Sequence, residues 1–354
     1  MGDPQFEPTD TPPIHVTQVL GTTALNADGT PQDPQEIAAD GTSRLVPSTS
    51  IRIRFDRFLL PSSISRQAVC LRADLADVPT YTKCTNAVFV QPTYDPVRRE
   101  IVLRQDKGER LALGTLYKLT LYQQQLQGDC TGDNPTSCGV LAFDRAALEK
   151  PFTITFRTVD ADPGTALDET VPEGTFCGDK GAAAALGATC SYATCHGPSS
   201  KSGSSCVPTK SNPVTDCAEG LSFYNLQYGN FTDTQQTAIN RVAHQTMMGE
   251  AASTPEKTPA RFGRAMPIID AFNPGVAGSP GNSYTMYKIL TGMSIDAAPD
   301  DIKPSDDEVQ RLRDTFVVGM PMPPPDIGTG PLDAEQLTNL SNWIQRGAPL
   351  STCP

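Results

Sequence analysis

Hydrophobic and polar residues alternate strictly in several short segments of the first half of the chain. In residues 51–55, isoleucine or phenylalanine at every odd position alternates with arginine. Alternation with a period of two predicts strands that bury one face. Comparable apolar segments predict further strands at residues 87–90, 101–104, 117–122 and 152–157. Because turn-rich connections separate these segments, the pattern is typical of an antiparallel β-sandwich.

The pattern changes after residue 159. Residues 160–164 are rich in aspartate, proline and glycine and are typical of a linker. Helix-start signatures follow, in which a short capping side chain stands three residues before Gln or Glu; they begin at Thr232, Ser305 and Asp333. The last one predicts a helix that ends at Gly347 and has an apolar face made of Leu337, Leu340, Trp343 and Ile344.

These two patterns predict a multidomain protein, with an all-β sandwich followed by an all-α, loop-rich domain. A chain of 354 residues is long enough to build two separate cores. The expected parts are a flexible leader over residues 1–39, the sandwich over 40–160, a linker over 161–175 and the helical domain over 176–354.

The cysteine content indicates an oxidising compartment. The chain has ten cysteines and no pair of C-x-x-C motifs of the zinc-binding type. Its start lacks the basic and apolar segments of a signal peptide, so we expect that a signal was removed. The expected location is periplasmic, or associated with the outer membrane or cell surface, in a Gram-negative bacterium. A lipid-anchored cysteine ahead of this sequence is a further hypothesis.

The chain is acidic, with a formal net charge of −12. From residue 161 onward there are 12 basic against 21 acidic residues, so most of the excess lies in the second half. This negative charge argues against nucleic acid as a partner. It suits binding to a basic protein, or it serves only to keep the protein soluble. No stretch approaches the roughly 18 uninterrupted apolar residues of a membrane span, so no transmembrane segment is expected.

The segment from Cys190 to His196 carries the most specific chemistry. Two thiols can add to the two vinyl groups of haem, and a histidine directly after the second cysteine is placed to ligate the iron. The usual spacing is C-x-x-C-H, whereas four residues separate Cys190 from Cys195. The alternative is a local disulfide between these cysteines, with His196 an ordinary surface residue.

A proline-rich segment offers a sixth ligand for the iron. Met320 and Met322 lie in Gly-Met-Pro-Met-Pro-Pro-Pro, where the prolines keep the backbone extended. Met322 directly precedes the run of prolines and is the preferred distal ligand, with Met320 the alternative. His244, on an apparent helix, would give a bis-His iron of lower potential. The competing interpretation is that these methionines fill gaps in a core.

Five ordered elements of the second half resemble the class I-type cytochrome c domains of secreted multidomain bacterial proteins. They are Cys-His-Gly at 195–197, Gly-Leu-Ser-Phe-Tyr at 220–224, Gly-Asn-Ser-Tyr at 281–284, Met-Pro-Pro at 322–324 and Trp-Ile-Gln-Arg-Gly-Ala-Pro at 343–349. The resemblance implies one covalent haem c, with Cys190 and Cys195 as thioether residues, His196 as proximal ligand and Met322 as distal ligand. The x4 attachment loop and the stretch 199–217 depart from the family pattern.

The first half, over roughly residues 40–160, resembles bacterial Ig-like domains. The segment IRIRFDRFLLPSSI and the closing FTITFRT carry this resemblance. It implies a spacer or surface module without catalysis.

Haem attachment would leave eight cysteines, an even number available for four disulfides. Local pairing is entropically easiest, which favours Cys70 with Cys84, Cys130 with Cys138, and Cys206 with Cys217. Cys177 and Cys353 then remain for a bond between the start and the end of the second domain. The sequence leaves the connectivity open.

The leading functional hypothesis is an exported mono-haem electron-transfer protein with a spacer domain and a redox protein partner. A second hypothesis is a haem-free surface binding or adhesion protein stabilised by disulfides. A third is a peroxidase-type haem enzyme, which requires the distal methionine to leave the iron. No catalytic triad, phosphate loop or carboxylate pair stands in a convincing context, so an electron carrier is favoured over a catalyst.

Overall fold

The chain forms two compact units, Phe6–Thr170 and Val171–Pro354, the latter together with Met1–Gln5. The computed structural model describes residues 11–66, 68–74, 84, 87–88, 90–106, 108–123, 139–161, 163, 174–190, 199–200, 217–218, 266–271, 276–292, 303–317, 322 and 332–349. In the second unit the description is therefore confined to a few well-separated segments.

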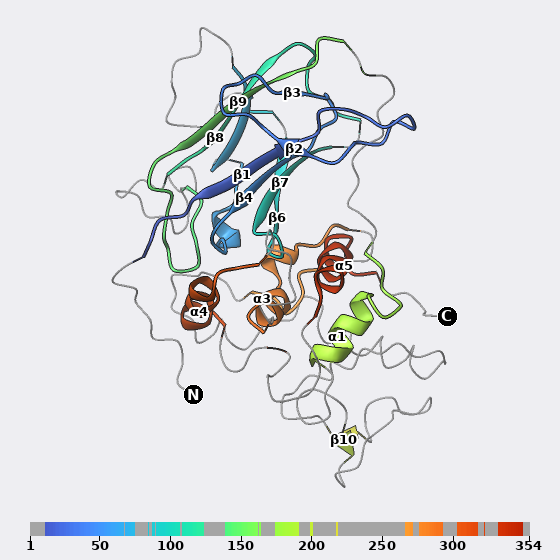
Figure 1. Cartoon of the computed structure of the whole chain (residues 1–354). Helices are drawn as coiled ribbons and strands as arrows, with labels where there is room; N and C mark the ends of the chain where they lie inside the picture. Colours follow the sequence, from blue (N-terminus) through green and yellow to red (C-terminus); the bar gives the residue numbers. More distant parts are fainter. Residues whose placement is uncertain are drawn as a thin grey trace. The chain divides into compact units, whose positions relative to one another are not determined.

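The first unit contains a five-stranded antiparallel sheet in the order β2-β1-β4-β7-β6 (Figure 1). Its strands are β1 (Val16–Gly21), β2 (Gln35–Glu36), β4 (Ile51–Phe55), β6 (Val90–Asp95) and β7 (Glu100–Gln105). In β4 the odd positions Ile51, Ile53 and Phe55 are at most 1% exposed. The two arginines between them lie on the opposite face of the sheet, as period-2 alternation requires.

A second sheet has the order β3-β9-β8-β5, formed by β3 (Arg44–Leu45), β5 (Val69–Ala73), β8 (Leu116–Leu121) and β9 (Phe152–Thr158). All its pairs are antiparallel except β3 with β9. Tyr117 of β8 stacks on Phe156 of β9 with ring centroids 5.7 Å apart. The amide of Val46 donates to the carbonyl of Thr22 at 3.0 Å, which joins the chain after β3 to the end of β1.

A disulfide joins Cys70 of β5 to Cys84, with the Cα atoms 5.5 Å apart. This confirms the first of the local cysteine pairs. Cys130, Cys138 and Cys206 lie outside the described residues, so the other two local pairs stay predictions.

The strands expected at 51–55, 101–104, 117–122 and 152–157 are confirmed as β4, β7, β8 and β9. The one expected at 87–90 is displaced, because Ala87 makes an isolated bridge to Arg72 and β6 begins only at Val90. Residues 16–21, expected in a flexible leader, form β1, which lies between β2 and β4. The physical reason is that β1 buries Val19 and Leu20 and completes the hydrogen bonding of β4.

The second unit contains four described helices: α1 (Ala182–Cys190), α3 (Tyr284–Leu290), α4 (Asp306–Thr315) and α5 (Ala334–Gln345). A 3-10 turn, η4 (Pro280–Asn282), precedes α3, and two short strands, β10 (Ser199–Ser200) and β11 (Cys217–Ala218), pair with each other. Helix α1 packs against α5. Next to this contact, the ring of Phe176 lies 5.6 Å from that of the fully buried Trp343.

The helix starts follow the predicted capping chemistry. Asp333 accepts from the amide of Gln336, whose side chain accepts from the amide of Asp333, so α5 begins with a capping box. Ser305 caps α4 by accepting from the amide of Glu308 at 3.2 Å. Burial raises the pKa of Asp333, but hydrogen bonds from Lys180 and from the Gln336 amide outweigh it, and the pKa is lowered. The signature at Thr232 lies outside the described residues.

The predicted fold class, an all-β Ig-like sandwich followed by an all-α cytochrome c-like domain, is wrong. Most of the described regular structure is β, in the two sheets of the first unit. The second half is not a helical cytochrome-like domain, because its four described helices have only 7–12 residues each and β10 and β11 form a further small sheet. Capping motifs predict where a helix starts but not how long it is. Prolines and glycines in the sequence between the capping motifs keep these helices short.

Candidate functional site

Cys190, the first thiol of the predicted haem-attachment segment, is the last residue of α1. The small residues Ala182, Ala183 and Ala185 of this helix are fully buried. Cys195 and His196 lie outside the described residues, as do Met320 and His244. The structure therefore places one end of the attachment segment at the end of a helix that packs on α5.

Cys177 is disulfide-bonded, and the geometry of α1 excludes Cys190 as its partner. The amides of Ala182 and Ala183 donate to the carbonyls of Thr175 and Phe176, so Cys177 lies at the start of α1. Cys190 lies at the other end of this nine-residue helix, about 12 Å away at 1.5 Å per residue. A disulfide needs Cα atoms within about 7 Å. The backbone of α1 thus separates Cys190 from Cys177 by more than a disulfide spans.

The region around Cys177 favours Cys353 as its partner. Trp343, whose ring contacts that of Phe176, donates from Nε1 to the carbonyl of Pro349 at 2.8 Å. Cys353 follows Pro349 by four residues, a length of chain that reaches about 13 Å when extended. These contacts of Trp343 support the prediction that Cys353 is the partner of Cys177.

Non-reducing peptide mapping is expected to recover Cys177 linked to Cys353. Closing a loop of this length stabilises the fold by about 4–5 kcal/mol on the chain-entropy model. As a control, Cys177→Ser should release Cys353 for alkylation in the folded protein. An alkylated Cys353 in the unsubstituted protein would contradict the pairing.

Met322, the preferred distal ligand, is a described residue and is half-buried. Its amide donates to the carbonyl of Lys288, in the last turn of α3, at 3.1 Å. Gly292, just beyond α3, lies directly against the Met322 backbone. The structure thus fixes the backbone that carries this thioether to the C-terminal end of α3, a contact that the sequence analysis missed. The Thr-Gly pair after an apolar helix predicts a helix end but not what packs against it.

The resemblance element at 281–284 begins the same helix. Asn282 donates to the Asp270 carboxylate at 2.8 Å, and the amide of Asp270 donates to Ser283 Oγ at 2.8 Å. Tyr287 and Tyr284 meet the ring of Phe316 edge-on, with centroids 5.7 and 5.4 Å apart. These contacts anchor α3 at its start and along its length.

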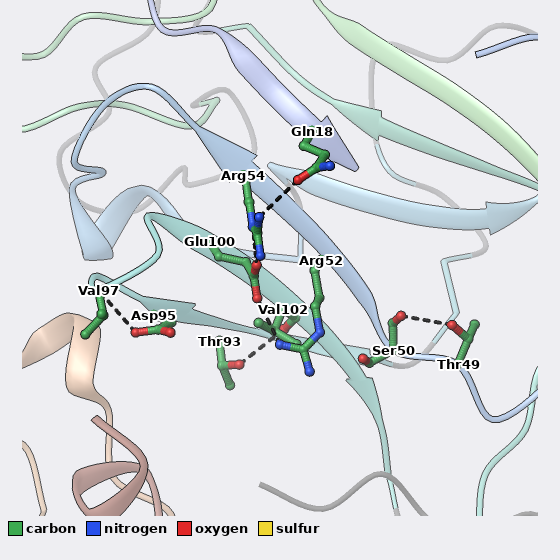
Figure 2. Close-up of polar contacts among 10 residues, drawn as sticks. All are labelled: Gln18, Thr49, Ser50, Arg52, Arg54, Thr93, Asp95, Val97, Glu100 and Val102. Atoms are coloured by element: carbon green, nitrogen blue, oxygen red, sulfur yellow. Dashed lines mark hydrogen bonds and ion pairs between the residues drawn. The ribbon is translucent and has the colours of Figure 1, made fainter. Parts of the chain in front are cut away.

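A second concentration of polar groups lies in the first unit (Figure 2). The carboxylate of Glu100 is fully buried and accepts from Arg52 and Arg54, each at 3.0 Å, one to each oxygen. Arg54 also donates to the side chain of Gln18 at 3.0 Å. Because both carboxylate oxygens are engaged, this cluster stabilises the sheet across β1, β4 and β7 rather than offering a catalytic acid.

Comparison of the chain with protein-family models and with curated proteins finds no match. In the part of the chain that the structure describes, no group of three or more His, Cys, Asp or Glu side chains could hold a metal ion. Within the same residues, no helix is both long and apolar enough to cross a membrane.

The donor set nevertheless suits haem. Two thiols, one imidazole and one thioether are the groups that attach haem covalently and ligate its iron. The described members of this set are compatible with that role, because the length of α1 separates Cys190 from Cys177 and the backbone of Met322 is held in place. The geometry of the complete set involves residues outside those described.

Proposed function

We propose that the chain is an exported electron-transfer protein that carries one covalently attached haem in its second unit. The observation that carries the proposal is the sequence of the segment from Cys190 to His196, in which a histidine directly follows the second of two thiols. Covalent attachment requires the two thiols and the adjacent histidine. The proposal therefore does not depend on a cytochrome c-like fold.

Each residue has a defined part in this proposal. Cys190 and Cys195 would hold the haem through thioethers, and His196 and Met322 would ligate its iron. Bound haem supplies a one-electron change of oxidation state. A histidine and a thioether would together occupy both free positions on the iron, which would favour electron transfer over oxygen chemistry. The acidic second half suits a basic redox protein as partner.

The deciding experiment is an intact mass of the denatured protein after export in a host that attaches haem. A mass increased by one haem, together with a Soret band, supports the proposal, because a covalent bond survives denaturation. A colourless protein with the mass of the polypeptide alone contradicts it. The account would then be a disulfide-stabilised binding protein, with which the disulfides at Cys70 and Cys177 are also consistent.

Met322→Ala is expected to abolish the far-red sulfur-to-iron band of the oxidised protein and to open the sixth position to carbon monoxide after reduction. A thioether ligand raises the potential above that of a bis-His site, so the potential should fall. Met320→Ala is the matched control and should keep the band. In a polyproline II segment, with three residues per turn, side chains two residues apart point to different sides.

The reverse result, with the band lost in Met320→Ala only, would make Met320 the ligand. A band that survives both substitutions would favour His244. Rapid carbon monoxide binding by the unsubstituted reduced protein would instead favour peroxidase chemistry.

A further inference from the structure

The backbone of Met322 lies so close to Gly292 that a side chain at position 292 would not fit between them. A Cβ on Gly292 would contact the carbonyl oxygen of Met322 and lie 2.7 Å from its carbonyl carbon and 3.0 Å from its nitrogen. All three atoms belong to the backbone, so rotation of a side chain cannot relieve the overlap. Any residue larger than glycine must separate the two segments.

The Gly292 side of this contact is firmly held. The amides of Thr291 and Gly292 donate to the carbonyls of Tyr287 and Ile289, at 3.0 and 2.9 Å. Arg313 of α4 donates to the carbonyl of Thr291. Of the residues of α3, only Lys288 is not buried. The Gly292 side of the contact is therefore anchored, and we expect an added Cβ to displace the Met322 backbone instead.

A displacement of the Met322 backbone would break one identified hydrogen bond. In this bond the amide of Met322 donates to the carbonyl of Lys288, in the last turn of α3, at 3.1 Å. This hydrogen bond and the close contact with Gly292 both hold the Met322 backbone on the end of α3. Displacement by even a fraction of an ångström shifts the thioether, and a weak axial ligand tolerates little displacement.

We infer that Gly292 is a positioning residue for the thioether ligand Met322: its missing side chain lets the Met322 backbone seat on the end of α3 and so fixes where the sulfur lies. This inference rests on the proposed function. It assigns Gly292 no contact with haem and no part in attachment. It makes the redox potential of the protein depend on a residue that has no functional group.

The test compares Gly292→Ala with Gly278→Ala in the haem-loaded, full-length protein. Gly278 is the matched control, because a Cβ there would contact the carbonyl oxygen of Ile344 and lie 2.6 Å from that of Asp270. Both substitutions overfill a backbone contact in the same unit, but only the first touches Met322. The measurements are intact mass, the far-red band of the oxidised protein, the redox potential and carbon monoxide binding after reduction.

Gly292→Ala is expected to keep the mass of one haem while losing the far-red band, lowering the potential and binding carbon monoxide. Gly278→Ala should keep the band and potential of the unsubstituted protein. A folded, haem-loaded Gly292→Ala that retains the band overturns the inference, and so does loss of the band in both variants. Absence of haem from the unsubstituted protein overturns the proposed function itself, which the mass shows before any variant is compared.

If Gly292→Ala does not fold, the variant Arg313→Ala tests the same inference. This substitution removes the donor to the Thr291 carbonyl without introducing an overlap, so it loosens the turn that receives Met322. A weakened far-red band with haem still attached supports the inference. An unchanged band and potential overturn it.

Discussion

Replacing Cys190 and Cys195 together by alanine is expected to abolish covalent haem and leave the first unit folded. In the proposed function the two thiols are the attachment points, so the variant should show the mass of the polypeptide alone after denaturation. The first unit has its own core, built from both sheets, and its own disulfide. Intact mass measures the first effect, and urea unfolding followed by far-UV circular dichroism measures the second.

Met322→Ala is the control for this experiment, because it removes a ligand but no attachment point and should keep the mass of one haem. A double cysteine variant that still carries that mass would contradict the assignment of the thioether residues. Loss of the β-sheet signal in the variant would instead contradict the independence of the two units. Single substitutions should retain some haem through the remaining thioether.

The first unit shows how far alternation alone reaches. In β4, β8 and β9 the buried residues fall at every second position, so sequence and structure agree on strand and inward face. Alternation does not report pairing order. The adjacency of β1 to β4, and the parallel pairing of β3 with β9, join segments far apart in the sequence. The short β1 has no such alternation, and its strand conformation comes from the neighbours that it pairs with.

The second unit shows where local signals stop. The Asp333 capping box and the apolar face of α5 are local, and both are confirmed. The amount of helix is not a local property, because helices of 7–12 residues depend on tertiary contacts for their stability. An all-α prediction made from caps and one clear helix therefore overstated the regular structure of the second half.

The candidate site was predictable to different degrees. Attachment chemistry belongs to consecutive residues, so the sequence alone identifies Cys190, Cys195 and His196 as a hypothesis. The anchoring of Met322 depends on a residue thirty positions earlier, Gly292, whose only feature is the absence of a side chain. A pattern of residue types carries no signal for such a contact, and only the fold reveals it.

Glu100→Ala is expected to destabilise the first unit by about 3 kcal/mol. Glu100 is fully buried, and the substitution leaves two arginines that have lost their carboxylate. Breaking a buried ion pair in this way costs about 3–5 kcal/mol. The lower end applies here, because the side chains of Arg52 and Arg54 keep 21% and 16% exposure and can turn toward water. Urea unfolding of the protein with its disulfides intact measures the change in the free energy of unfolding.

Two further variants separate charge from other causes. Glu109→Ala removes an exposed glutamate from the same unit and should change the free energy of unfolding by no more than about 0.5 kcal/mol. A triple variant with Arg52→Met, Arg54→Met and Glu100→Leu removes all three charges and keeps apolar volume, so it should recover most of the loss. If Glu100→Ala is as stable as Glu109→Ala, the cluster of Glu100, Arg52 and Arg54 contributes nothing to the stability of the first unit. If the triple variant is no more stable than Glu100→Ala, the loss comes from packing and not from the uncompensated charge of the arginines.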